Sequence, residues 1–204
     1  AKIYLSRFVP AEPGKPSERV LVGTSPISNL RIARGEYILE IEKDGYIKSE
    51  RSISGAILHV GNLMVVPPPI SIQQKLFTST LMPSQMVFVP GSEYRLVAWA
   101  RPTDTRVQLD DYFIDRYEVS NREYQEFING GGYLKKQYWK YPFVKDGKTL
   151  SWEEAVSQLK DHTGLAGPRS WTNQNFPEGK ADYPVTDVTW YEAAAYAEFK
   201  GKQL

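Results

Sequence analysis

The stretch YPVTDVTWYEAAAYAEFKGKQL, residues 183–204, decides how the C-terminal part of this chain folds. Thr189 is placed to cap a helix, and Glu192, three residues later, completes a capping box in which each side chain bonds the backbone N–H of the other residue. The alanines between residues 193 and 197 favour a helix that packs closely on its neighbours. Gly201 stands where a left-handed C-cap is expected. We therefore predict a short strand, a turn and a helix that ends near Gly201.

The same capping pattern occurs twice earlier in the chain. Ser120 with Glu123, and Ser151 with Glu154, each place a hydroxyl three residues before a carboxylate. The first pair predicts a helix that ends at the glycines 130–132, and the second predicts a helix that runs to about residue 160. The glycine triplet follows a helix instead of preceding one, so it indicates a C-cap and loop and not a phosphate-binding loop.

Residues 1–82 predict strands. The segment EYILEIE, residues 36–42, alternates apolar residues with glutamates, which is typical of a strand with one buried face. Asp44 and Gly45 follow as a turn, and similar turn signals recur at regular spacing along the segment. Many short strands separated by turns predict a small all-β sandwich.

The same segment resembles the PEGA-type β-domain. The resemblance is carried, in order, by GTSPI at residues 23–27, GEY at 35–37 and KDGY at 43–46. Such domains accompany bacterial signalling or envelope proteins, so the resemblance implies a spacer or adhesion-like module without catalytic residues. It favours a bacterial, extracytoplasmic location over a cytoplasmic one, which the composition leaves open.

Residues 83–204 resemble the N-terminal part of the formylglycine-generating enzyme family, also called the sulfatase-modifying-factor family. The matching landmarks are MVFVPG at 86–91, YFIDRYEVSN at 112–121, GPRSW at 167–171 and the stretch from 184 to 204. The resemblance implies an α+β domain with a C-type-lectin-like fold. We predict an α+β chain with a PEGA-like sandwich over residues 1–82, and the N-terminal portion of a sulfatase-modifying-factor-type domain over residues 83–204.

The catalytic members of that family oxidise a cysteine in a sulfatase with a copper-binding cysteine pair, and they bind structural calcium. The resemblance places those positions after the portion matched here, and this chain has no cysteine. It therefore implies no catalytic, cofactor-binding or metal-binding residue within these 204 residues. The acidic residues Asp110, Asp111, Asp115 and Glu118 lack the glycine-turn spacing of a calcium loop, so we expect a solvated or salt-bridged strand there.

Four residues are candidates for ligand binding: Tyr138, Trp139, Lys140 and Trp171. The first three belong to a stretch, residues 133–145, in which lysines are interspersed with aromatic residues. Such rings can stack on a sugar or on a single-stranded nucleic acid. Alternatively, they fix a long loop onto the domain while the lysines stay solvated, and the family resemblance favours this alternative. With a net charge of +1 and a pI of about 8.0, no nucleic-acid partner is expected.

These observations predict a non-catalytic binding or scaffold region of a larger bacterial multidomain protein. The alternative is the N-terminal part of a formylglycine-generating-type oxidase whose active site lies beyond residue 204. A protein or glycan partner is compatible with the first prediction. We expect the missing C-terminal portion, a partner chain or self-association to cover an open apolar face. No apolar run approaches the roughly 18 residues that a membrane span needs.

Overall fold

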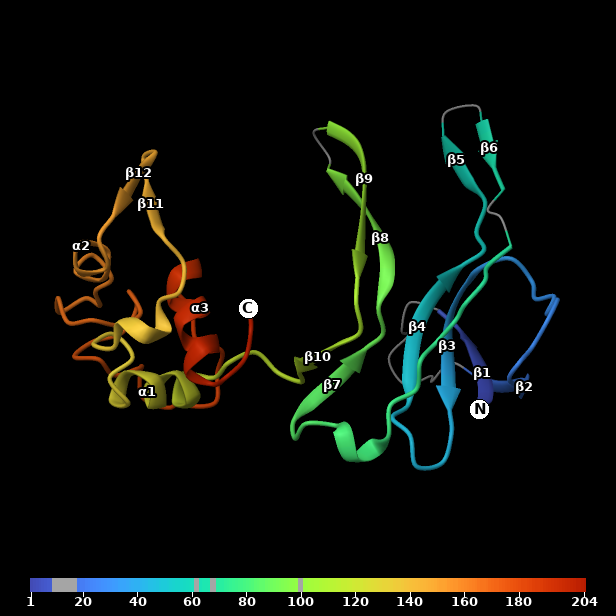
Figure 1. Ribbon diagram of the computed structural model, residues 1–204, viewed down its shortest axis with the longest axis horizontal. Coiled ribbons are helices and arrows are strands. Elements are labelled where there is room, and N and C mark those ends of the chain that lie inside the picture. The colour runs from blue at the N-terminus through green and yellow to red at the C-terminus, as the bar shows by residue number, and fades with distance from the viewer. Residues whose placement is uncertain (9–17, 61–62, 67–68, 99–100) are drawn as a thin grey trace. The chain divides into compact units, whose positions relative to one another are not determined.

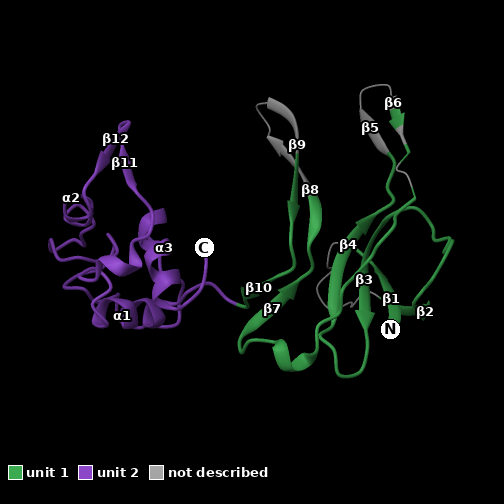
Figure 2. Cartoon of the chain, viewed as in Figure 1, with its two compact units in different colours: residues 1–116 green, residues 117–204 purple. Residues whose placement is uncertain are grey.

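The computed structural model describes residues 1–8, 18–60, 63–66, 69–98 and 101–204. The chain divides into two compact units, residues 1–116 (unit 1) and residues 117–204 (unit 2), which are coloured separately in Figure 2. Each unit is described by itself below. The domain boundary predicted after residue 82 lies inside unit 1 and stays a prediction.

A four-stranded antiparallel sheet forms the N-terminal part of unit 1 (Figure 1). Its strands are β1 (Lys2–Arg7), β2 (Arg19–Thr24), β3 (Glu36–Glu42) and β4 (Ser49–Ser54), in the order β2-β1-β3-β4. The half-buried strand predicted over residues 36–42 is confirmed as β3. Ile3 of β1 pairs with Ile41 of β3 and Leu5 pairs with Leu39, and all four side chains are buried. They form the core on one face of the sheet.

The two faces of this sheet differ in chemistry. On the apolar face, Ile72 and Leu76 from the segment after β6 pack against the four buried side chains. On the other face, Glu40 is only 8% exposed, and it accepts a hydrogen bond from Arg19 Nε at 2.5 Å and lies 3.0 Å from Lys48 Nζ. Burial acts to raise the pKa of Glu40, but Lys48 and Arg19 together outweigh it and lower that pKa. The apolar face and the polar face of the sheet agree with the alternation of residues in the sequence. The all-β sandwich predicted for residues 1–82 stays a prediction.

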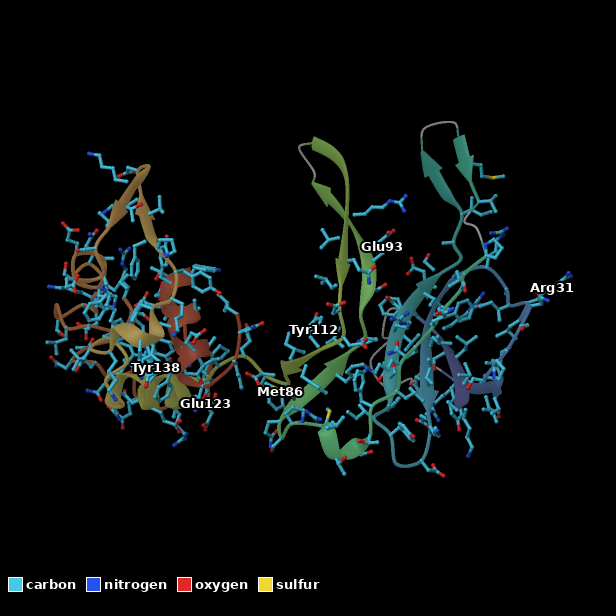
Figure 3. The ribbon with its side chains drawn as sticks, in the orientation of Figure 1. Arg31, Met86, Glu93, Tyr112, Glu123 and Tyr138 are labelled. Carbon is cyan, nitrogen blue, oxygen red and sulfur yellow. The ribbon has the colours of Figure 1, made fainter. Side chains whose placement is uncertain are left out.

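Paired strands make up most of the remainder of unit 1. The pairs are β5 (Leu58–Val60) with β6 (Leu63–Val65), β8 (Ser92–Ala98) with β9 (Arg101–Leu109), and β7 (Met86–Val89) with β10 (Tyr112–Asp115). A short 3-10 helix, η1 (Ser79–Leu81), precedes β7. Met86 and Tyr112, labelled in Figure 3, are the first residues of β7 and β10. The strands predicted within residues 86–91 and 112–121 are thus confirmed.

Unit 2 contains three α-helices, and each begins with a capping box. The helices are α1 (Asn121–Asn129), α2 (Trp152–Val156) and α3 (Trp190–Phe199). At each start the N-cap hydroxyl accepts a bond from the N–H of the glutamate three residues later, and the glutamate carboxylate accepts the N–H of the N-cap residue. The 3-10 helix η2 (Lys136–Tyr138) and a hairpin of β11 (Phe143–Lys145) and β12 (Lys148–Leu150) lie between α1 and α2. All three predicted capping boxes are confirmed.

Helix α3 ends as its sequence predicts. Gly201 has a φ of +68°, in the left-handed region that favours glycine. Its N–H donates to the carbonyl of Glu198 at 3.1 Å, and the N–H of Lys202 donates to the carbonyl of Ala197 at 2.8 Å. These two bonds form a Schellman motif, which satisfies carbonyls that the helix itself leaves free.

Helix α2 is shorter than predicted. The sequence predicts a helix that runs to about residue 160, whereas α2 ends at Val156. The hydroxyl of Ser157 donates to the carbonyl of Glu154 at 2.7 Å, and Nε2 of Gln158 donates to the same carbonyl at 3.2 Å. Side chains therefore occupy the Glu154 carbonyl, while the backbone N–H of Gln158 donates to the carbonyl of Ala155 at 3.0 Å, so the α-helical bonding pattern ends here.

The glycines after α1 end this helix and also allow close packing. Gly130 is the C-cap of α1, and Gly131 has a φ of +77°. A Cβ atom at Gly132 would lie 2.2 Å from the ring of Phe127. Gly132 therefore lets the chain pass directly over a buried ring, which no other residue type would permit without a shift.

The chain as a whole is α+β, with strands in both units and the α-helices in unit 2. Across the described ranges, we find no helix with both the length and the apolar character that crossing a membrane requires.

Candidate functional site

Unit 2 is built around an aromatic core. The buried members of this core are Tyr124, Phe127, Tyr133, Trp139, Phe143, Ala155, Trp171, Ala195 and Tyr196. Tyr124 of α1 stacks on Tyr196 of α3, with ring centroids 5.5 Å apart and an interplanar angle of 21°. Phe127 of α1 meets the edge of the Tyr196 ring at 6.0 Å. Such ring pairs stabilise a fold beyond their buried area by about 0.5–1.5 kcal/mol each, so they hold α1 against α3.

A chain of hydrogen bonds runs through this core. The hydroxyls of Tyr124 and Tyr133 lie 3.1 Å apart, and the Tyr133 hydroxyl donates to Oε1 of Glu192 at 2.5 Å. The second carboxylate oxygen of Glu192 accepts the N–H of Thr189 at 2.7 Å. Glu192 is only 2% exposed. A buried carboxylate is costly unless it is hydrogen-bonded, and here both oxygens have partners.

The two tyrosines of this network are neutral over a wide pH range. Burial raises the pKa of Tyr124 well above its ordinary value, and the Glu192 carboxylate adds to that rise. Burial likewise raises the pKa of Tyr133, with further contributions from Tyr124 and Glu192. A phenol with a raised pKa stays protonated and acts as a hydrogen-bond donor. The network is therefore suited to hold the core in place.

A second buried carboxylate organises the loop after α2. Oδ1 of Asp161 accepts hydrogen bonds from the N–H and the hydroxyl of Thr163, at 2.8 and 2.7 Å, and from the N–H of Leu165 at 3.1 Å. Oδ2 accepts the N–H of Gln174 at 2.7 Å. The Gln174 side chain continues the network by donating to the carbonyl of Ala166 at 2.8 Å. Asp161 thus joins the two ends of the loop over residues 161–174.

The pKa of Asp161 reflects these contacts. Burial by itself would raise it, but the bonds donated by Gln174, Thr163 and Leu165 outweigh burial and lower the pKa of Asp161. The carboxylate is therefore ionised at neutral pH and fixed in place. The sequence analysed alone gives Asp161 no distinguishing motif, because its partners lie up to 13 residues away.

The four candidate ligand-binding residues do not form one surface. Trp171 is 1% exposed, and Trp139 is 8% exposed with its Nε1 donating to the carbonyl of Gly132 at 2.9 Å. Tyr138, labelled in Figure 3, is half-buried and its ring lies 5.5 Å from that of Phe199, whereas Lys140 is exposed. These positions agree with the alternative in which the rings fix the loop and the lysines stay solvated. Ligand binding by these four residues stays a prediction.

An exposed aromatic pair lies elsewhere in unit 2. Tyr141 is 46% exposed and Trp190 is 54% exposed, and their ring centroids are 4.8 Å apart in an edge-to-face arrangement. Tyr191, the residue after Trp190, accepts the N–H of Val144 with its hydroxyl at 3.0 Å. We call Tyr141 and Trp190 the aromatic surface. Sequence reasoning missed it, although a tryptophan directly after an N-cap, on the first turn of a helix, was an available signal.

The metals that the family resemblance implies do not fit the residues present. Copper binding by a cysteine pair is not supplied by this chain, which has no cysteine. Among the described residues, no group of three or more histidine, aspartate or glutamate side chains is arranged to hold an ion. In the acidic segment that contains Asp110 and Asp111, Oδ1 of Asp111 accepts the N–H of Gly91 at 2.7 Å. This carboxylate oxygen therefore bonds the protein backbone.

The chain is thus a mixed α+β protein. Its unit 2 combines three helices that begin with capping boxes and a core of aromatic side chains. The family model described as "Sulfatase-modifying factor enzyme 1-like domain" matches residues 73–204, which is more than half of the chain. The chain therefore belongs to the sulfatase-modifying-factor family, as its sequence landmarks predict. The match begins before the predicted start at residue 83, and the PEGA-like module stays a prediction.

Several curated relatives are similar to the chain over part of their length. The formylglycine-generating enzyme of Bos taurus is 36% identical over 110 residues, which cover 48% of this chain and 29% of the relative. That of Thermomonospora curvata is 31% identical over 140 residues, covering 58% of this chain and 45% of the relative. The hercynine oxygenase of Mycobacterium tuberculosis is 31% identical over 106 residues, covering 48% and 22%. The chain thus covers less than half the length of each of these relatives.

Proposed function

We propose that these residues form a non-catalytic binding and scaffold region of a larger bacterial protein that contains a sulfatase-modifying-factor-type domain. The observation that carries the proposal is the use made of the buried ionisable groups in unit 2. Glu192, Tyr133 and Tyr124 bond one another and the start of α3, and Asp161 bonds the backbone of its own loop. The polar atoms of these four side chains are hydrogen-bonded within unit 2. We infer that these side chains stabilise the fold that presents the surface of the unit.

The aromatic surface is the part of unit 2 best suited to contact a partner. Exposed tryptophan and tyrosine rings contribute large contact areas with few rotatable bonds, and they are enriched where proteins bind one another. The edge-to-face pair of Tyr141 and Trp190 would pack against the apolar side chains of a protein or the C–H face of a glycan. The occupant can be a further part of the same protein, a partner chain or a second copy.

The test combines dye binding with oligomeric state. The Tyr141→Ala, Trp190→Ala double variant should bind less of a dye specific for exposed apolar surface, and it should self-associate less in light scattering, while its melting temperature stays within a few degrees of the parent value. Leu134→Ala is the matched control, because Leu134 is even more exposed but lies outside the aromatic surface. A compact monomer that binds no dye would overturn the binding role. Turnover of a substrate by the 204-residue chain would overturn the non-catalytic role.

The second candidate function is the N-terminal part of a formylglycine-generating-type oxidase. It is favoured by the relatives named formylglycine-generating enzyme, which are up to 36% identical to the matched part of this chain. The native protein sequence beyond residue 204 distinguishes the candidates. A closely spaced cysteine pair there, with copper binding that is lost in cysteine-to-serine variants and oxidation of a cysteine-containing peptide, would replace the scaffold proposal. Their absence would leave the scaffold proposal in place.

A further inference from the structure

A cleft of about 370 Å³ lies along strand β4 in unit 1. One wall consists of β4 residues 50–54, and the others come from residues 70–72 and from Val89, Pro90 and Ser92. Its volume falls in the range of ligand-binding sites, and its walls combine serine hydroxyls with isoleucine and valine side chains. The cleft therefore offers both hydrogen-bonding and apolar contacts next to a strand.

β4 is an edge strand of its sheet, and its outer edge carries unpaired backbone groups. The N–H of Gly55 donates to the carbonyl of Gly35 at 2.8 Å, which fixes the alternation of the β3–β4 ladder. By this alternation, Ser49, Arg51 and Ile53 bond β3, while the N–H and C=O groups of residues 50, 52 and 54 point outward. Within the described residues, these outward groups make no backbone hydrogen bond. Such an edge is a template for another strand.

Arg51 places a largely uncompensated cation in this cleft. Its Nη2 donates to the carbonyl of Gly91 at 2.7 Å, and its buried Nε has no partner among the residues that the structure describes. In the part of the chain that the structure describes, no carboxylate pairs with this guanidinium. A guanidinium has five N–H donors, so most of those of Arg51 are left for another acceptor. Carboxylates match the guanidinium fork in both charge and geometry.

The wall opposite β4 is held in place before any ligand arrives. The N–H of Gly91 donates to Oδ1 of Asp111 at 2.7 Å, and a Cβ atom at Gly91 would lie 2.6 Å from the carbonyl oxygen of Leu109. Hydrogen bonds therefore hold Gly91 both to Asp111, between β9 and β10, and to Arg51 of β4. A preformed wall lowers the entropic cost of binding.

We propose that this cleft docks an extended peptide segment of a partner protein, which adds to β4 as a further strand and places an aspartate or glutamate side chain on Arg51. The backbone groups of residues 50, 52 and 54 bond the added strand, and the apolar wall receives its alternate side chains. Arg51 lies in the middle of β4 with cleft residues on both sides, so the carboxylate comes from within the peptide and not from its C-terminus. Glu50 also lines the cleft, but Lys48 lies 3.5 Å from its carboxylate and offsets its charge.

The experiment is a selection from a library of short extended peptides, made on the intact 204-residue chain. The library alternates valine and threonine around one varied central position, and individual peptides are then measured by fluorescence anisotropy. Peptides with a central glutamate should be enriched and should bind at least tenfold more tightly than those with glutamine. Arg51→Gln should remove this preference, since the charge pair is lost while a hydrogen-bonding side chain remains.

A second variant tests the strand addition. Ser52→Pro removes an outward N–H without touching the β3 ladder, and it should abolish binding of glutamate and glutamine peptides alike. The matched control is Ser71→Ala, which lies in the cleft but outside the edge strand. Hydrogen exchange at residues 50, 52 and 54 should slow when the glutamate peptide is bound. Absence of any acidic enrichment, unchanged binding by Ser52→Pro, or a preference for a C-terminal carboxylate over an internal glutamate would each overturn the proposal. None of these results depends on the aromatic surface of unit 2.

Discussion

The hydroxyl of Tyr133 donates a 2.5 Å hydrogen bond to Oε1 of Glu192, a residue 59 positions later in the chain. The same carboxylate accepts the N–H of Thr189 and so completes the capping box of α3. One side chain therefore both begins a helix and fixes a ring of the aromatic core. Because the two oxygens serve separate partners, the two functions can be tested separately.

Replacing Tyr133 with phenylalanine should lower the free energy of unfolding by about 1.5–3 kcal/mol, because a buried carboxylate loses a donor. Glu192→Gln keeps an acceptor for the N-cap N–H, so the helix start should persist. A double-mutant cycle of the two should give a coupling energy of about 0.5–3 kcal/mol in urea unfolding, followed by the fluorescence of the buried tryptophans.

Tyr141→Phe, at an exposed ring, is the control and should change stability by less than about 0.5 kcal/mol. Equal effects of Tyr133→Phe and Tyr141→Phe would show that the network adds nothing.

Unit 2 should lose stability in alkaline solution. The pKa values of Tyr124 and Tyr133 are raised in the folded state, so both residues stay neutral there, while in the unfolded chain they ionise near their ordinary pKa of about 10. The contribution of the two tyrosines to the free energy of unfolding is fully present below about pH 10. It is lost as the pH rises further, by up to about 1.4 kcal/mol per pH unit for each tyrosine.

Tyr133→Phe should make this decline shallower, and Tyr141→Phe should leave it unchanged. Urea unfolding at several pH values between 9 and 11 measures the slope, and equal slopes in all three proteins would contradict the assignment.

The loop of Asp161 should make unit 2 sensitive to acid. The folded-state pKa of Asp161 is lowered, so its contribution to stability is present above the unfolded pKa of about 3.9 and is lost as the pH falls through that value and the folded one. Asp161→Asn should cost about 2–4 kcal/mol at pH 7, because several buried donors lose a charged acceptor. It should also flatten the stability profile below pH 4. Asp146→Asn, at an exposed turn, is the control. A variant as stable as the control at pH 7 would refute this role for Asp161.

Gly132→Ala should destabilise unit 2 by about 1–3 kcal/mol through overpacking, since its Cβ would lie 2.2 Å from the Phe127 ring. A second change, Phe127→Leu, removes the part of the ring that the new methyl group meets, so the double variant should lose less than the sum of the two single losses. Gly147→Ala is the comparison, because its φ of +75° adds backbone strain but no atom lies within 4 Å of its added Cβ. Thermal unfolding measures all four variants. Strictly additive losses would mean that the methyl–ring clash is not the cause.

Local patterns in the sequence predict the parts of this fold that local contacts determine. The three capping boxes connect residues three positions apart, and the facing of Leu39 and Ile41 follows from simple alternation along β3. Both features depend on backbone geometry that the residue types themselves favour. The early end of α2 was not predicted, because it depends on which donors bond the Glu154 carbonyl.

The candidate site could not be predicted in the same way. Trp139 and Trp171 have the composition of a ligand platform, and only the packing of the chain shows that both are buried. The contacts of Arg51 with Gly91, and of Tyr133 with Glu192, connect residues 40 and 59 positions apart. Such partners are fixed by tertiary packing, to which a single sequence gives no direct access.

The position of Glu192 also has a consequence for how unit 2 reaches its native state. A partly folded form with α3 docked and residues 130–139 still loose would hold a carboxylate in an apolar setting with one oxygen unpartnered, at a cost of several kcal/mol. We expect that form to be sparsely populated, because the Tyr133 hydroxyl that bonds the Glu192 carboxylate in the native state is not yet in place. We therefore expect helix α3 and the aromatic core to form together, in one cooperative folding step.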